Sequence, residues 1–182
     1  MDLNHQILIA LPDMQDIRFN QAIILICEHN EDGAMGLVLN HPMEINTEQV
    51  FSDLNLNIPQ TQTNHSVLDG GPLYKNCGFV IHQSNQQYKS SVNIQNNLTL
   101  TTSKDLLDDI SNHVFTDNWQ FILGYSGWTS DQLESEIAEN TWLTCPLNLD
   151  LIFNTPKEQQ WKKALSLIGI DNYQNIIGVG HA

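Results

Sequence analysis

The stretch at residues 21–40, QAIILICEHNEDGAMGLVLN, places two apolar runs on either side of a short acidic turn. The runs 21–29 and 34–40 are apolar on both alternating faces, which is typical of strands covered on both sides. Between them, the turn NEDG contains Gly33, which can adopt a positive φ. The pattern predicts a β-hairpin with two buried strands and an exposed acidic turn.

Outward from this hairpin, we expect strands at 6–11, 77–83, 88–94, 98–101 and 119–125, with a turn at 126–128. The stretch 67–73 is expected to be a strand end that runs into a Gly-Gly-Pro turn. Helices are expected to begin at Thr47, Ser103, Thr129 and Thr155, the third with Gln132 completing a capping box and the last with Pro156 and Glu158 in its first turn. In this last helix, an apolar stripe precedes a stop at Gly169; it comprises Trp161, Ala164, Leu165 and Ile168. Early hairpins followed by alternating strands and helices indicate an α+β fold with a mixed sheet.

Size and charge restrict the classes of function. The chain has 182 residues, of which 41% are hydrophobic, and this is enough for one domain spanning 1–182. It carries 21 acidic residues against seven Lys and Arg, a net charge of −14, and its single arginine is Arg18. Proteins that grip nucleic acid need clustered cations to displace counterions. Direct nucleic-acid binding and contact with an anionic membrane are therefore disfavoured.

The compartment is also indicated by the sequence. The longest apolar run, residues 22–27, is far too short for a membrane span, and the first residues lack the basic region of a secretory signal. Three cysteines without a CxxC motif argue against a disulfide framework. We expect a soluble, reduced protein of the cytoplasm.

The hairpin offers two kinds of chemistry, each with a simpler alternative. Cys27 and His29 share a strand face and could supply two zinc ligands, but a tetrahedral site needs further ligands that the sequence does not place nearby. A buried thiol beside a histidine is the simpler interpretation. Glu28 and His29 could form an acid–base pair, although neighbours on a strand diverge, and solvated turn acids are more common. No metal or cofactor is expected.

Three later motifs invite comparison with known sites. LDGGP at 68–72 lacks the spacing and lysine of phosphate loops and is explained more simply as a tight turn. GYSGW at 124–128 is one residue short of a nucleophile elbow around Ser126. Trp128 is either a surface anchor for partners at a helix entry or a packed side chain. The next helix is expected to present a solvated acidic face made of Asp131, Glu134, Glu136 and Glu139.

Five segments in register resemble the bacterial AlgH/YqgE family: 10–42, then LDGGPLYKNCGFVIH, LTTSKDLLDDI and LGYSGWTSDQLESEIAENTWL, and finally 150–171, followed by the closing GHA. The resemblance implies a mixed, bifurcated β-sheet curled into a pseudo-barrel with helices packed outside. It implies no catalytic residues, since the family is essentially uncharacterised; one member is associated with transcriptional control of alginate synthesis. The family's recurring surface features map to Glu28, His29, Asn30, Gly33, Asn40, Gly70, Gly71, His82, Tyr125, Gly127 and Trp128.

The leading hypothesis is a non-catalytic binding or regulatory protein that acts through an unidentified protein or small-molecule partner. The alternative is a small-molecule hydrolase or metal-assisted enzyme that uses the 27–33 hairpin and His82. A transcriptional regulator without direct DNA contact comes third. The eleven mapped residues are the binding candidates in each case.

Overall fold

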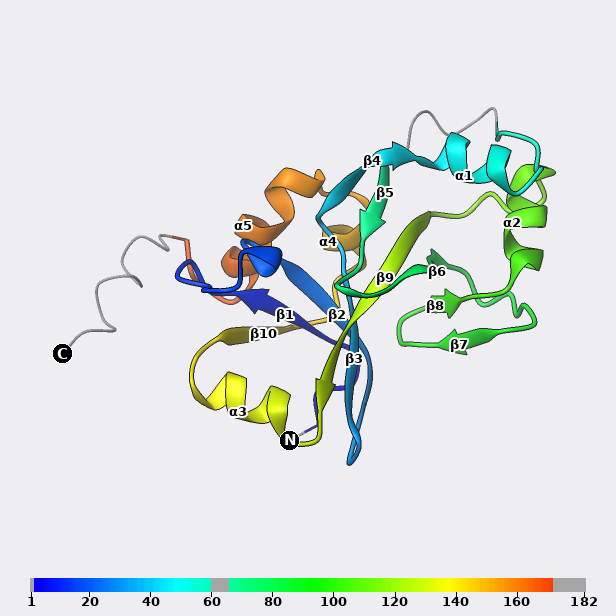
Figure 1. Cartoon of the computed structure of the whole chain (residues 1–182). Coiled ribbons are helices and arrows are strands. Elements are labelled where there is room, and N and C mark those ends of the chain that lie inside the picture. Colours follow the sequence, from blue (N-terminus) through cyan, green and yellow to red (C-terminus); the bar gives the residue numbers. More distant parts are fainter. Residues whose placement is uncertain (1, 60–65, 172–182) are drawn as a thin grey trace.

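The computed structural model describes residues 2–59 and 66–171 (Figure 1). Its strands are β1 (Gln6–Ala10), β2 (Ile23–Asn30), β3 (Gly33–Val38), β4 (Pro42–Asn46), β5 (Ser66–Asp69), β6 (Leu73–Gln83), β7 (Ser91–Asn93), β8 (Leu98–Thr101), β9 (Trp119–Thr129) and β10 (Trp142–Pro146). Its helices are the 3-10 helix η1 (Ile17–Phe19), α1 (Thr47–Asp53), α2 (Lys104–Ser111), α3 (Gln132–Ala138), α4 (Leu149–Phe153) and α5 (Lys157–Leu167).

The strands form one strongly curled, mostly antiparallel sheet in the order β10-β1-β2-β3-β9-β6-β8-β7. The pair β4–β5 branches from it, and β5 runs parallel to β9. The long strand β9 crosses the middle of the molecule, with α4 and α5 on one side and α1 and α2 at the far end (Figure 1). The α+β class and the curled sheet with outer helices are therefore confirmed.

The sheet divides along β9. Residues 119–123 and Tyr125 of β9 pair with β6, whereas residues 126–129 pair with β3. Glycines allow the backbones to approach at this branch: a Cβ on Gly70 would collide with the Gly124 carbonyl oxygen, and one on Gly71 with the Ser126 hydroxyl. Gly71 also has φ +146°, which side chains disfavour. The LDGGP motif is thus a turn of close backbone contact.

The central hairpin has the predicted form. Ile23, Leu25 and Leu37 are fully buried, and the turn residues Glu31 and Asp32 are exposed. The register of β2 and β3 shifts once, between Ile26 and Glu28, which is a β-bulge. The prediction of a hairpin with covered strands and an acidic turn is therefore confirmed.

The helices cover the sheet through the apolar residues expected of them. Leu106, Leu107 and Ile110 of α2 are buried, as are Trp161, Ala164 and Leu165 of α5. The Trp161 indole also donates a hydrogen bond of 2.7 Å to the Ala10 carbonyl oxygen, which joins α5 to β1. Gly169 follows α5 at φ +81°, as predicted for a helix stop.

Several predicted boundaries were wrong. The strand expected at 119–125 continues to Thr129, so the predicted turn at 126–128 is strand, because β3 supplies a new partner. The strand expected at 88–94 shortens to β7, whereas the strand end and Gly-Gly-Pro turn expected at 67–73 are confirmed by β5 and the turn that follows it. β4, β10 and α4 were not predicted; their short segments acquire strand or helix structure from neighbours rather than from a periodic pattern.

Helix starts also differ in detail. The N-cap of α5 is Pro156, and the Thr155 hydroxyl donates instead to the Asp150 carbonyl oxygen. The N-cap of α3 is Asp131, but the Gln132 side chain reaches back to the Thr129 amide at 3.0 Å, so half of the predicted capping box is present. None of the helices in residues 2–59 and 66–171 is long and apolar enough to cross a membrane. The closing GHA at 180–182 lies outside the described residues.

Candidate functional site

The tip of the hairpin projects two neighbouring side chains to opposite sides of the sheet. After the bulge, Glu28 is exposed on one side and His29 is half-buried on the other. Gly33 closes the turn at φ +134°, where a Cβ would collide with the Trp128 carbonyl oxygen of β9. The sequence therefore holds the turn tightly against β9, and each face of the hairpin borders a different hollow.

On the Glu28 side lies an open groove of about 670 Å³, which we call the hairpin groove. Its lining comes from β2, β3, β6 and β9. Apolar side chains form its floor, and acidic side chains from the end of β2 and from the turn form one rim. The floor consists of Met35, Leu73, Phe79 and Tyr125, and the rim includes Glu28 and Asp32.

An aromatic platform adjoins this groove. Tyr74 stacks on Tyr125 with ring centroids 5.7 Å apart and planes 7° from parallel, and Phe79 meets Tyr125 edge-on. Tyr74 is 69% exposed and has φ +46°, an uncommon conformation for a side-chain-bearing residue. It sits where the pairing of β6 with β9 slips between Leu73 and Gly78. The slip thus places an exposed aromatic ring over the groove's Tyr125.

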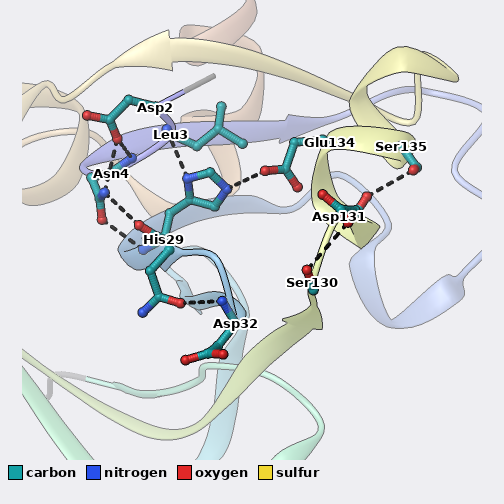
Figure 2. A network of polar contacts seen from close by, with 10 residues as sticks. Asp2, Leu3, Asn4, His29, Asp32, Ser130, Asp131, Glu134 and Ser135 are labelled. Carbon is teal, nitrogen blue, oxygen red and sulfur yellow. Dashed lines mark hydrogen bonds and ion pairs between the residues drawn. The ribbon is translucent and has the colours of Figure 1, made fainter.

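On the other side, His29 is the centre of a polar network (Figure 2). Its Nε2 lies 2.7 Å from Glu134 Oε1, and its Nδ1 accepts a long hydrogen bond of 3.4 Å from the Leu3 amide. Nε2 therefore carries the proton and donates a hydrogen bond to Glu134. The His29 side chain is only 8% exposed. With both ring nitrogens engaged, His29 ties α3 and the N-terminal segment to the hairpin.

Asn4 strengthens this attachment. Its side-chain amide donates to the His29 carbonyl oxygen at 2.8 Å and accepts from the His29 amide at 2.8 Å, as a neighbouring strand would do. Asp2 in turn accepts two hydrogen bonds from Asn4, which lower the pKa of Asp2. The pKa of Glu134 is also lowered, first by its own backbone amide and then by the hydrogen bond from His29. Both carboxylates are therefore ionised at neutral pH.

The polar network borders a hollow of about 380 Å³ lined by hairpin, N-terminal and α3 residues. Ser130 contributes a hydroxyl to its lining, and this hydroxyl donates to the Asp131 carboxylate at 3.4 Å. Among the described residues, no group of three His, Cys, Asp or Glu side chains is placed to hold a metal ion. Cys27 is buried, and burial raises the pKa of its thiol to about 12. The interpretation of Cys27 as a buried thiol is confirmed.

His82 lies far from the hairpin. It pairs with Trp119 at one end of β9, whereas Gly33 pairs with Thr129 at the other. It is fully buried, its Nε2 is 2.8 Å from Thr101 Oγ1, and burial lowers its pKa to about 4. A single site made of the 27–33 hairpin and His82, as the enzyme alternative required, is therefore wrong.

Other candidates hold the fold. Asn40 accepts from the Ile23 amide at 2.9 Å and donates to the Gln21 carbonyl oxygen at 2.8 Å, which fastens the start of β2. Gly70 and Gly71 lie at the branch of the sheet, as described above. Ser126 is buried within β9 and donates to the Gly70 carbonyl oxygen, so it does not stand at a strand-to-helix turn.

Of the two interpretations of Trp128, the packed side chain is confirmed and the surface anchor is wrong. It is 7% exposed because it points inward from the extended part of β9. Its indole donates to the Glu136 carboxylate at 2.9 Å. Glu134 and Glu136 therefore do not belong to a solvated acidic face, although Asp131 and Glu139 are exposed. Of the candidates, six line the hairpin groove: Glu28, Asn30, Gly33, Tyr125, Gly127 and Trp128.

Sequence reasoning missed several residues of this region. Tyr74 and Leu73 follow a glycine-proline turn, and only the slip in β6 exposes them. Asn4 and Glu134 are far from the hairpin in sequence. The spacing of three residues places Glu134 on the same helix face as Asp131, so it was expected to belong to an acidic face. Nothing in this pattern indicated that His29 is its partner.

Known proteins match this chain over nearly its whole length. A family model described as AlgH-like matches residues 7–173. A UPF0301 protein of Photobacterium profundum is 42% identical and one of Neisseria meningitidis serogroup B is 38% identical, each over the full length of both chains. The solution structure of AlgH from Pseudomonas aeruginosa has a TM-score of 0.80 at 36% identity, covering 99% of this chain and 96% of that one. A crystal structure from Corynebacterium diphtheriae shares the fold, with a TM-score of 0.75 at 20% identity over 93% and 90% of the two chains.

Proposed function

This chain belongs to the AlgH-like family, and from the geometry of its hairpin groove we propose that it is a non-catalytic binding protein that recognises a polypeptide partner. One observation carries the proposal: six of the eleven residues that the sequence singled out line this groove together. They come from two segments almost a hundred residues apart, which supports a shared role in recognition rather than local packing alone.

The chemistry of the groove indicates what it binds. Its apolar floor and the stacked Tyr74 and Tyr125 offer the flat aromatic contacts that are common at interfaces. Its rim carries Glu28 and Asp32, on a chain with net charge −14. A segment that pairs apolar with basic side chains complements such a surface. The same charge opposes DNA, so a regulatory role would act through protein contact.

The proposal places the protein in the cytoplasm as one domain over residues 1–182. A hydrolase using the hairpin has less support. A general base needs a free ring nitrogen within reach of a proton. His29 uses one nitrogen on Glu134 and the other on the Leu3 amide, and it has little exposed surface. Its contacts suit a residue that fixes the hairpin tip in place.

The test is a photo-crosslinking experiment in living bacterial cells. A photoreactive phenylalanine replaces Tyr74, which is 69% exposed beside the groove, and in a matched strain it replaces Val114, which is 64% exposed beyond α2. We expect position 74 to capture a protein that position 114 does not capture. Trp128→Ala is unsuitable as a test because Trp128 belongs to the core.

The rim then gives the specific control. Glu28→Lys with Asp32→Lys reverses the charge at the groove, and Glu44→Lys with Glu48→Lys makes the same change in net charge at exposed positions elsewhere. The first pair is expected to lower the crosslinked yield severalfold, while the second leaves it close to that of the parent. Equal capture from positions 74 and 114, or equal loss in both pairs, would refute the groove as the recognition surface.

A further inference from the structure

A third hollow, of about 460 Å³, lies between η1, α3 and the end of β9. We call it the indole pocket and define it by Asp13, Phe19, Trp128, Glu136, Glu139 and Trp142. It shares Gly127 and Trp128 with the hairpin groove, but its remaining lining comes from other segments. Its chemistry can therefore be considered separately from the function proposed above.

One carboxylate in this pocket is held rigidly. Glu136 Oε2 accepts from the indole of Trp128 at 2.9 Å and from the indole of Trp142 at 2.7 Å, while its Oε1 accepts from the Gln132 side chain at 2.8 Å. The two indoles meet edge-to-face with centroids 6.2 Å apart. A negative charge is thus fixed beside aromatic rings before any ligand arrives, so binding would not have to order this side chain.

The charge of the pocket is not balanced from within. Asp16 is neutralised by a bidentate contact with Arg18. For Asp13, Glu136 and Glu139, no ion pair exists among residues 2–59 and 66–171. Arg18 also lines this hollow but is paired with Asp16, so the other three carboxylates have no cation paired with them, and a positively charged ligand would complement them.

The aromatic wall already accepts a guanidinium group. The Arg18 guanidinium carbon lies 5.8 Å from the centroid of the Phe19 ring, and Phe19 meets Trp142 edge-on at 5.6 Å. A planar guanidinium can stack on a ring and donate to carboxylates at the same time, whereas an ammonium ion is a compact point charge. The contact of Arg18 shows that this geometry is reached at the rim of the pocket.

We propose that the indole pocket binds a guanidinium group, with Glu136 as its fixed anionic partner, Asp13 and Glu139 at its rim and Phe19 as its stacking surface. The group comes either from a free alkylguanidine or from an arginine side chain of a polypeptide, since both present the same chemistry. A single group bound at a half-open site has a dissociation constant on the order of 1 mM. Affinity rises where further contacts join it.

The experiment follows two reporters that the pocket supplies itself. The indole N–H signals of Trp128 and Trp142 are recorded by two-dimensional NMR of the ¹⁵N-labelled protein during titration with butylguanidinium, N-acetylarginine amide or the uncharged N-acetylcitrulline amide. We expect both cations to shift both indole signals with saturation, and the citrulline derivative, which has nearly the same shape, to leave them in place. Tighter binding of the arginine derivative points to a polypeptide source, and tighter binding of butylguanidinium to a free one.

Paired variants separate a site from general attraction to an acidic protein. Asp13→Asn with Glu139→Gln removes two exposed rim charges, and Glu44→Gln with Glu48→Gln removes two exposed charges elsewhere. The rim pair is expected to weaken binding at least fivefold and the control pair less than twofold. Unshifted indole signals, an equal response to the citrulline derivative, or equal weakening by both pairs would overturn the proposal. None of these outcomes bears on the hairpin groove, whose test probes position 74 and the charges of Glu28 and Asp32.

Discussion

Acid should destabilise this protein through His82, a residue that the fold keeps neutral. The ring is fully buried between Tyr88 and Phe115, with centroids 5.9 and 5.3 Å away. Its Nε2 contacts Thr101, and its Nδ1 has no hydrogen-bond partner among the described residues. Burial lowers the His82 pKa from 6.5 to about 4, while the negative charge of Asp117 opposes part of that shift.

The sign and the size of the effect follow from this difference. Above pH 6.5 the histidine is neutral in both states, so it adds no pH dependence. As the pH falls from 6.5 to 4, the unfolded chain takes up a proton that the folded chain refuses, and the free energy of unfolding decreases. A difference of 6.5 against about 4 corresponds to a loss of about 3 kcal/mol, of which about 2 kcal/mol is reached at pH 5.

Urea denaturation of the parent, His82→Gln and His113→Gln between pH 7.5 and pH 4.5 measures this loss. Glutamine does not titrate and keeps a polar group near Thr101. The free energy of unfolding of His82→Gln should therefore fall less steeply with pH than that of the parent, whatever the difference between the two proteins at pH 7.5. His113 is exposed, and its variant should follow the parent curve in slope. Parallel curves for the parent and His82→Gln, or a His82 NMR titration near pH 6.5, would refute the reasoning.

Three further predictions concern the branch of the sheet, the indole pocket and the thiols. Gly71→Ala should lower the free energy of unfolding by about 2 kcal/mol or more, because the added Cβ meets Ser126. Gly169→Ala, with open space around it, should lower it by only about 1 kcal/mol. Urea denaturation measures both, and similar losses in the two variants would contradict the close contact at Gly71. Glu136→Gln leaves one acceptor oxygen for three donors. We therefore expect the free energy of unfolding to fall by about 1–3 kcal/mol and the indole N–H groups of Trp128 and Trp142 to exchange hydrogen faster. Unchanged exchange at both indoles would count against the bridging carboxylate. At pH 8, Ellman's reagent should modify Cys77 quickly, while Cys27 and Cys145, whose thiol pKa values burial raises to about 12 and about 11, react slowly; a fast phase that survives Cys77→Ser would be inconsistent with the structure.

The candidate site could be predicted only in part. Glu28, Asn30 and Gly33 follow from the hairpin itself, since the turn and its flanking strands are neighbours in the chain. The aromatic platform could not be predicted, because Tyr74 reaches Tyr125 through a slip in strand pairing. Trp128 was left open between a surface anchor and a packed side chain because a turn was expected at 126–128, and the continuation of β9 along β3 decides for packing.

By itself, the sequence determined the elements whose signals are local. Alternating and continuous apolar runs produce the buried hairpin of β2 and β3, and stripes at helical spacing bury α2 and α5. These patterns depend on the period of each backbone and need no knowledge of distant partners. The family resemblance likewise rests on segments in register, and the α+β class follows from both.

Only the tertiary structure decided what the polar residues do. On α3 and at its two caps, four acids looked alike in sequence, yet Glu134 binds His29 and Glu136 binds two indoles, while Asp131 and Glu139 face solvent. The physical reason is that a carboxylate has no preferred face until partners with matching donors are brought beside it. Those partners arrive from β2, β9 and β10, so sheet pairing between distant segments, rather than any local pattern, determines where the hollows lie and which charges they contain.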